Sequence, residues 1–108
     1  MEMSDPVEAL AALANPTRLA AFRLLIRHGP DGLAAGALAA SLGVPPSTLS
    51  AHLARLETAG LIERRRASRN LFYSVCIDRT RALLSFLLDD CCQGRPELCP
   101  PATESLAA

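Results

Sequence analysis

The chain has 108 residues, of which 50% are hydrophobic but only 4% aromatic, and its formal net charge is zero. This length suits one hydrophobic core rather than two, and Leu and Ala, which favour helices, have to build most of it. No run approaches the roughly 18 to 20 apolar residues that cross a bilayer, and the N-terminus lacks a signal-peptide pattern, so we expect a cytoplasmic protein without membrane contact.

Pro and Gly residues divide the N-terminal half into predicted helices. Asn15 fits a helix N-cap because its side chain can accept hydrogen bonds from the first turn, and Pro16 suits the first helical position. Gly43 breaks the chain between the last two of these helices, and Gly60 fits a C-terminal cap. The helices are expected over residues 4–14, 16–28, 33–42 and 46–59.

After Gly60 the hydrophobic period changes from that of helices to that of strands. Two strands are expected over residues 61–66 and 70–76, joined by a hairpin turn. A last helix, capped by Asp78, then runs into a group of cysteines. The order predicts a mainly α fold with a small β-hairpin: a winged helix-turn-helix of about five helices plus a two-stranded wing.

The second helix of such a pair enters the major groove of DNA, where its exposed residues reach base edges. Leucines at helical spacing give residues 46–59 one buried side and leave a polar side outside. Ser and Thr can bond bases or phosphates. The predicted DNA contacts on this helix are Ser47, Thr48, Ser50 and His52. His52 would equally suit a half-buried histidine with a protein partner, and some helix-turn-helix units serve protein contacts only.

Every basic residue is Arg, and four of them fall within six positions of the predicted hairpin. The tail is acidic, so a neutral total charge can hide a basic surface suited to DNA. Because side chains alternate along a strand, Arg64 to Arg66 cannot all face one way. We assign phosphate contacts to Arg64, Arg66 and Arg69; a solvated charge run is the alternative.

Three of the four cysteines, Cys91, Cys92 and Cys99, lie within nine residues. Gly94 and Pro96 allow the chain to turn between them. In a cytosolic chain such cysteines are ligands or redox groups more often than a disulfide framework. Three thiolates suit a soft ion with trigonal coordination, such as As(III) or Sb(III). Cys76, at a strand end, is expected to be a small core residue.

Other readings of the cysteine group stay open. Zn or Cd would need a fourth ligand, such as a histidine, a carboxylate or water. Two of the thiols could form a redox disulfide, although neighbouring carboxylates raise rather than lower a thiol pKa. Methylated trivalent arsenic needs only two thiols, and the cysteines could also be inert.

Three segments, Asn15-Pro16-Thr17-Arg18-Leu19, residues 47–53 and residues 56–62, resemble the ArsR/SmtB family of metal-responsive bacterial repressors. The resemblance extends over about residues 5–92. It implies a homodimer whose first and last helices form the interface, bound to operator DNA until an inducer arrives. The spacing Cys91-Cys92-x6-Cys99 is similar to the tail of an arsenic-responsive subset of the family.

The chain departs from the family pattern at two places. Ala34 and Gly36 stand where many members have a metal-binding Cys-x-Cys pair, and Pro46 stands where a polar residue is common. We therefore expect a DNA-binding and dimerisation domain over residues 1–92 and an inducer-binding tail over residues 93–108.

The predicted function is an As(III)-responsive transcriptional repressor, with Sb(III) as a possible inducer, that binds double-stranded operator DNA as a homodimer. The alternatives are a thiol-redox or Zn/Cd-responsive repressor of the same fold, or a metal-sequestering carrier. No catalytic triad, phosphate loop or catalytic metal motif is visible, so an enzyme and a catalytic cofactor are not expected.

Overall fold

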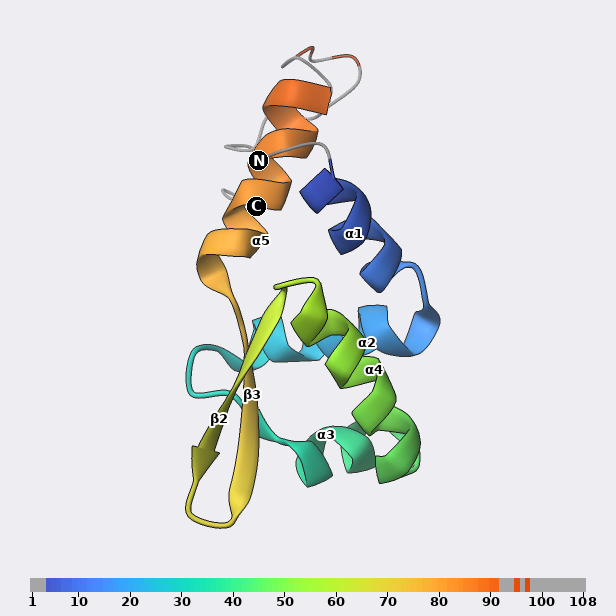
Figure 1. The fold of residues 1–108 in the computed structure, drawn as a ribbon, viewed down its shortest axis with the longest axis vertical. Helices are drawn as coiled ribbons and strands as arrows, with labels where there is room; N and C mark the ends of the chain where they lie inside the picture. Colours follow the sequence, from blue (N-terminus) through green and yellow to red (C-terminus); the bar gives the residue numbers. More distant parts are fainter. Residues whose placement is uncertain (1–3, 92–94, 96, 98–108) are drawn as a thin grey trace.

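The structure is a computed structural model and describes residues 4–91, 95 and 97. It is a winged helix-turn-helix, mainly helical with a small sheet, as the sequence predicted (Figure 1). In chain order the elements are α1 (Ser4–Leu13), α2 (Pro16–His28), β1 (Leu33–Ala34), α3 (Ala35–Leu42), α4 (Pro46–Thr58), β2 (Ile62–Ala67), β3 (Asn70–Val75), α5 (Ile77–Ser85) and a π-helical segment η1 (Phe86–Cys91). Within the described residues no single helix is long and apolar enough to cross a bilayer; α1 and α2 reach that length only as a pair bent by 101°.

The sheet has three antiparallel strands in the order β1-β3-β2, so the predicted two-stranded wing gains a third strand. β1 pairs Leu33 with Tyr73, where the sequence had predicted the start of a helix. Gly32 turns the chain so closely against β3 that the next two residues pair with it, and α3 begins only at Ala35. A two-residue strand is too short to show an alternating pattern.

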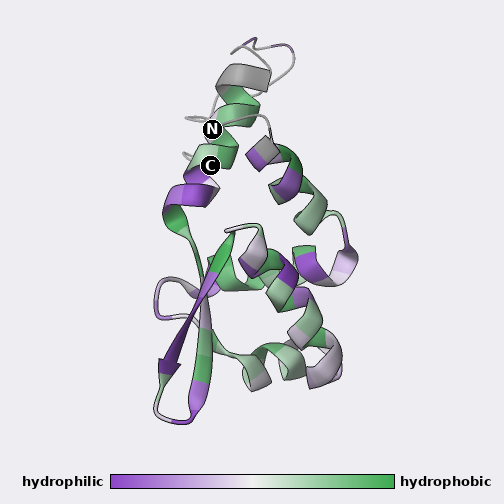
Figure 2. Ribbon diagram, viewed as in Figure 1, coloured by the Kyte–Doolittle hydropathy of each residue, from purple (hydrophilic) through white to green (hydrophobic). Residues whose placement is uncertain are grey.

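The core lies between the helices and the adjoining side of the hairpin. Its largest fully buried side chains come from leucines of α2, α3 and α4 and from the residue before β2: Leu25, Leu38, Leu49, Leu53, Leu56 and Leu61. Ile62 and Tyr73 bring β2 and β3 into the same cluster. Beyond that cluster β2 is hydrophilic (Figure 2). The wing is therefore anchored at one end and polar along the rest.

Helix ends follow the sequence signals closely in α2 and less so in α5. The Asn15 side chain accepts hydrogen bonds from the amides of Thr17 and Arg18 at 3.0 and 3.1 Å. Asp78 was expected to cap the last helix, but it lies in the first turn of α5 and Cys76 takes the N-cap position. The Cys76 carbonyl accepts the amide of Thr80 at 3.0 Å. The helix therefore starts directly where β3 ends.

Gly32 should be the glycine least able to accept a side chain. Its φ is +78°, and a Cβ there would lie 2.5 Å from the Tyr73 carbonyl oxygen. We expect Gly32→Ala to lower the free energy of unfolding by about 1 to 3 kcal/mol because it strains the β1–β3 contact. Urea unfolding followed by circular dichroism measures the change.

Gly36→Ala is the matched control, because a Cβ at Gly36 in α3 meets nothing within 4 Å. It should leave stability unchanged or raise it by up to about 1 kcal/mol, since Ala is the better helix former. Equal effects of the two substitutions would contradict the close approach of Gly32 to β3.

Candidate DNA-binding surface and regulatory sites

α4 has one buried side and one exposed side, as the sequence predicted. Leu49, Leu53 and Leu56 are buried in the core at 1%, 1% and 0% exposure. Ser47, Thr48 and Ser50 are exposed, so three hydroxyls lie on the surface near the start of the helix. α3 packs against α4 across a turn in which Gly43 has the left-handed φ of 67°. This places hydroxyl donors and acceptors where a helix-turn-helix meets a groove of DNA.

His52 also lies on α4, but it is half-buried and has a protein partner. Its Nδ1 lies 3.2 Å from Nη1 of Arg18 in α2. A guanidinium only donates hydrogen bonds, so Nδ1 is the acceptor and the ring proton is on Nε2. Nε2 has no hydrogen-bond partner within the part of the chain that the structure describes. His52 is thus half-buried with a protein partner at Nδ1, and its contact with DNA stays a prediction.

The arginines of β2 face opposite sides of the sheet. Arg64 pairs with Glu57 of α4 at 3.1 Å between Nε and Oε2. Arg65 faces the other way: its guanidinium lies 5.3 Å from the ring centre of Phe72 and donates to the Asp31 carbonyl at 2.9 Å. Sequence reasoning missed this role of Arg65, because the Phe72 pairing depends on the hairpin register.

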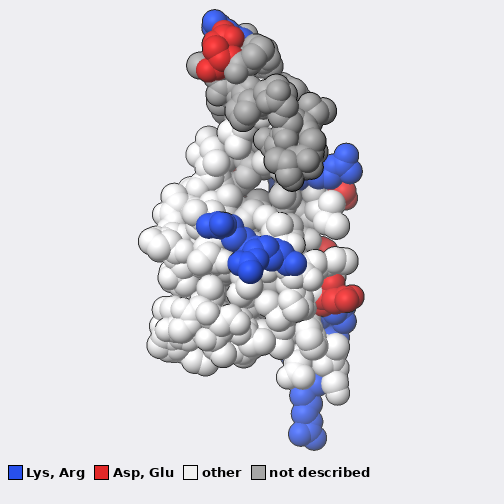
Figure 3. Space-filling model, turned by 180° about the vertical axis from the view of Figure 1, so that it is seen from behind, with Lys and Arg blue, Asp and Glu red and all other residues white. Residues whose placement is uncertain are grey.

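Arg66 and Arg69 are exposed near the end of the hairpin. β2 and β3 pair up to Ala67 and Asn70, and Ser68, with φ 60°, opens the two-residue turn. Among the described residues neither arginine forms an ion pair. Figure 3 shows basic side chains at the protruding end of the wing and in the middle of the same face. The wing tip therefore carries two free positive charges away from the core.

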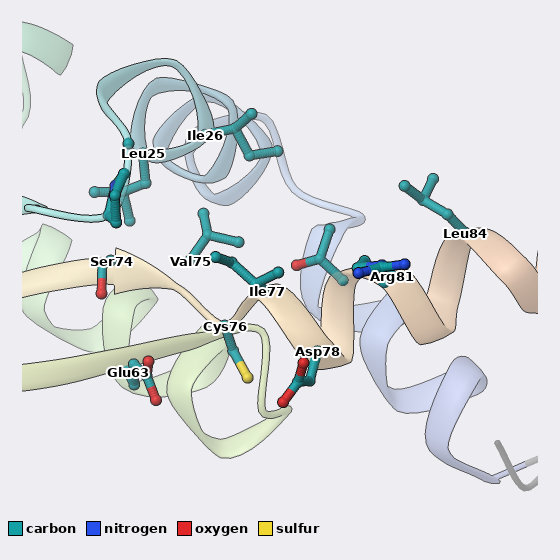
Figure 4. Close-up of a pocket in the computed structure, with 13 residues that line it drawn as sticks. Leu25, Ile26, Glu63, Ser74, Val75, Cys76, Ile77, Asp78, Arg81 and Leu84 are labelled. Carbon is teal, nitrogen blue, oxygen red and sulfur yellow. The ribbon is translucent and has the colours of Figure 1, made fainter. Parts of the chain in front are cut away.

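A groove of about 730 Å³ lies on another part of the molecule, between the end of α2 and the start of α5 (Figure 4). Its walls are mostly apolar, with Ile26, Val75 and Leu84 among them. Cys76 lines it as a half-buried free thiol, so the expectation that Cys76 belongs to the core is wrong. The chain passes from β3 into α5 at Cys76, which keeps this residue at the edge of the core.

Apolar side chains are also exposed on α1 and α5. Val7 is 57% exposed and Leu10 42% on α1, and Ile77 is 59% and Leu84 53% on α5. The two helices lie at the same end of the molecule, away from α3 (Figure 1). An ion pair of 3.5 Å between Asp5 and Arg79 joins them. This end of the molecule therefore presents exposed apolar side chains from two helices.

The predicted inducer site lies mostly outside the described residues. Cys91 ends η1, while Cys92 and Cys99 are not described. No group of three or more His, Cys, Asp or Glu positioned to hold a metal occurs in the described part of the chain. Ala34 and Gly36 lie at the junction of β1 and α3 and supply no thiol there. The three-cysteine site stays a prediction.

Comparisons with known proteins agree with this geometry. A family model described as a helix-turn-helix domain matches residues 13–65. The nodulation protein NolR of Rhizobium meliloti is 36% identical over 74% of the chain, and the chain spans only 63% of that protein. The putative arsenical resistance operon repressor ArsR2 of Halobacterium salinarum is 36% identical over 81% of the chain and 71% of its own length.

A solved structure is similar as well. It is the homodimeric winged helix-turn-helix DNA-binding domain of a possible ArsR-family transcriptional regulator from Mycobacterium bovis. The TM-score is 0.67 at 31% identity, over 82% of this chain and 81% of the other. With this level of identity over most of both chains, the protein belongs to the ArsR family of winged helix-turn-helix transcriptional regulators, a family of DNA-binding proteins and not of enzymes.

Proposed function

We propose that the protein is an As(III)-responsive transcriptional repressor, which binds operator DNA as a homodimer and leaves it when trivalent arsenic or antimony binds Cys91, Cys92 and Cys99. The observation that carries the proposal is the position of these thiols. They begin at the last residue of η1, which continues α5 directly. A soft ion bound there would act on the helix that also carries exposed apolar side chains.

The DNA-binding part rests on α4 and the wing. Ser47, Thr48 and Ser50 would contact bases or phosphates in the major groove, since they stand opposite the buried leucines. Arg66 and Arg69 would contact phosphates beside the groove. Arg64, the third predicted wing contact, is held by Glu57 and would have to leave it or share its guanidinium.

The exposed apolar side chains of α1 and α5 are the structural support for the proposed homodimer. Full burial of a Val, Leu or Ile side chain contributes about 1.5 to 3 kcal/mol, so an interface here would be stabilising. The Mycobacterium bovis relative is homodimeric, which supports a dimer here. Inducer binding at the end of the same interface could change the spacing of the two copies of α4, the recognition helix of each subunit. A coupling of about 1 to 3 kcal/mol suffices to empty an operator.

A thiol-redox or Zn/Cd-responsive regulator of the same fold is the second candidate. Asp89, Asp90 and Glu97 stand close to the cysteines in sequence and could complete a zinc site. The name of ArsR2 supports arsenic, whereas the name of NolR points to nodulation. A metal-sequestering carrier is disfavoured, because it would need neither the free arginines of the wing nor the exposed hydroxyls of α4.

Replacing Arg69 by Gln should weaken DNA binding by removing a phosphate contact. The plot of the logarithm of the DNA association constant against log salt concentration should become less steep by about one unit. Fluorescence anisotropy with the native promoter, repeated at several salt concentrations, measures it. Arg65→Gln is the control with the same charge change, since Arg65 is engaged by Phe72 and Asp31. A slope change as large for Arg65 as for Arg69 would contradict the assignment.

Replacing Leu84 by Glu should shift the protein from dimer to monomer, because a charge would be placed in the proposed apolar interface. Sedimentation velocity measures the oligomeric state. Ala40→Glu places the same charge at an exposed position of α3, at the other end of the molecule. This substitution should leave the dimer intact. A Leu84→Glu protein that remained dimeric would place the interface elsewhere.

Replacing Cys91, Cys92 or Cys99 by Ser should leave DNA binding intact and abolish release by arsenite. Wild-type protein should lose about 5- to 150-fold in DNA affinity on arsenite addition, the usual range of such coupling. Anisotropy titrations of the reduced protein measure both quantities. Cys76→Ser should behave as wild type, since Cys76 lies at the other end of α5.

Release by arsenite in all three tail variants would overturn the proposed ligand set. Release by zinc, cadmium or peroxide, with no response to arsenite, would favour the second candidate and leave the DNA-binding part unchanged.

A further inference from the structure

Arg18 makes side-chain contacts with two helices besides its own. It lies in α2, its Nε donates to the Ala12 carbonyl in the last turn of α1, and its Nη1 reaches His52 Nδ1 on α4 at 3.2 Å. Its own amide is held by the Asn15 cap at 3.1 Å, so the side chain starts from a fixed point. One residue thus joins the helix of the proposed dimer interface to the recognition helix.

Only arginine can serve both partners in this way. Its planar guanidinium carries five N–H donors on separate edges, so one edge can meet a carbonyl while another meets a ring nitrogen. Lysine offers one compact ammonium and cannot span the same two acceptors from one position. The Ala12 carbonyl lies near the C-terminal end of α1, where carbonyls lack helical partners and attract cations.

The contact also decides which nitrogen of His52 carries the proton. Since Nδ1 accepts from Arg18, Nε2 carries the hydrogen and can only donate. Within the described residues nothing accepts that hydrogen bond. His52 lies on α4 between the exposed hydroxyls near its start and Arg55, which is also exposed.

We propose that Arg18 is a positioning residue for DNA recognition, which holds His52 as an Nε2–H donor aimed at an acceptor on DNA and ties α4 to the end of α1. This inference rests on the proposed function, since it assumes that α4 meets DNA. The acceptor is a phosphate oxygen or an acceptor atom on a base edge, both of which a single N–H donor can meet.

The first test reads the tautomer of His52 in the free protein. Long-range proton–nitrogen correlation spectra should show an Nε2–H ring in wild type and a mixed tautomer in Arg18→Gln. Arg23→Gln is the matched control: Arg23 is an exposed arginine of the same helix with no ion pair or side-chain hydrogen bond within the described residues. It should keep the wild-type spectrum. An unchanged His52 tautomer in Arg18→Gln would overturn the proposal.

The second test measures DNA affinity. Arg18→Gln should weaken binding to the native promoter about tenfold, as expected if the hydrogen bond from His52 Nε2–H to DNA is lost. The dimer, followed by sedimentation velocity, should stay intact. Arg18→Lys should rescue only part of the affinity. When His52 is already replaced by Ala, Arg18→Gln should cost little more. Additive losses would mean that Arg18 acts independently of His52.

Two substitutions of His52 separate its two nitrogens. The amide of Asn can replace the Nδ1 acceptor that Arg18 uses, whereas the longer Gln can place an N–H near Nε2. We expect His52→Gln to keep more DNA affinity than His52→Asn, and the reverse order would contradict a donor role. These variants also test the proposal if Arg18→Gln does not fold.

The same titrations distinguish the two sources of the acceptor. A uniform loss across promoter and unrelated DNA indicates a phosphate; a loss confined to the promoter indicates a base edge. Wild-type protein that bound no DNA would refute the proposed function together with this inference. Wild-type binding with an unchanged Arg18→Gln affinity would refute this inference alone.

Discussion

Leu49, Leu53 and Leu56 bury one side of α4 in the hydrophobic core. These side chains fix α4 to the core along one side, with exposures of 1%, 1% and 0%. Because a helix that buries one side must present the other, the exposed hydroxyls follow directly from the leucine spacing. The same core holds the base of the wing through Ile62 and Tyr73. The recognition helix and the wing are therefore positioned by one cluster of side chains.

The other functional end of the molecule is built differently. α1 and α5 expose apolar side chains and are joined by the Asp5–Arg79 ion pair, a half-exposed contact that contributes little to stability by itself. In the proposed mechanism a partner subunit covers this end and the inducer binds where η1 stops. Arg18 then connects the two ends through hydrogen bonds to α1 and α4. A change at α1 would reach the DNA-binding helix through Arg18 as well as through the direct packing of α1 against α4.

Local sequence signals predicted the parts of the fold that depend on neighbouring residues. Asn15 and Pro16 marked the start of α2, and the alternation after Gly60 marked the hairpin. β1 was missed because two residues show no period, and the true N-cap of α5 was missed because Asp78 fits the same signal as a first-turn residue. The Arg18–His52 contact joins residues that are 34 positions apart in sequence. It depends on how α2 packs against α4, which no local sequence pattern shows. The cysteine site lies mostly beyond the described residues, and its residues stay a prediction.

Amide hydrogen exchange of the dimer, with and without its promoter DNA, tests the central claim most directly, because it maps the bound surface without altering the protein. We expect slower exchange in the first half of α4 and at the tip of the hairpin around Ser68 and Arg69. Exchange in α5 near the groove at Cys76 should stay unchanged. Protection confined to α5 and the C-terminal end, with α4 and the hairpin unaffected, would mean that DNA does not bind at α4 and the wing.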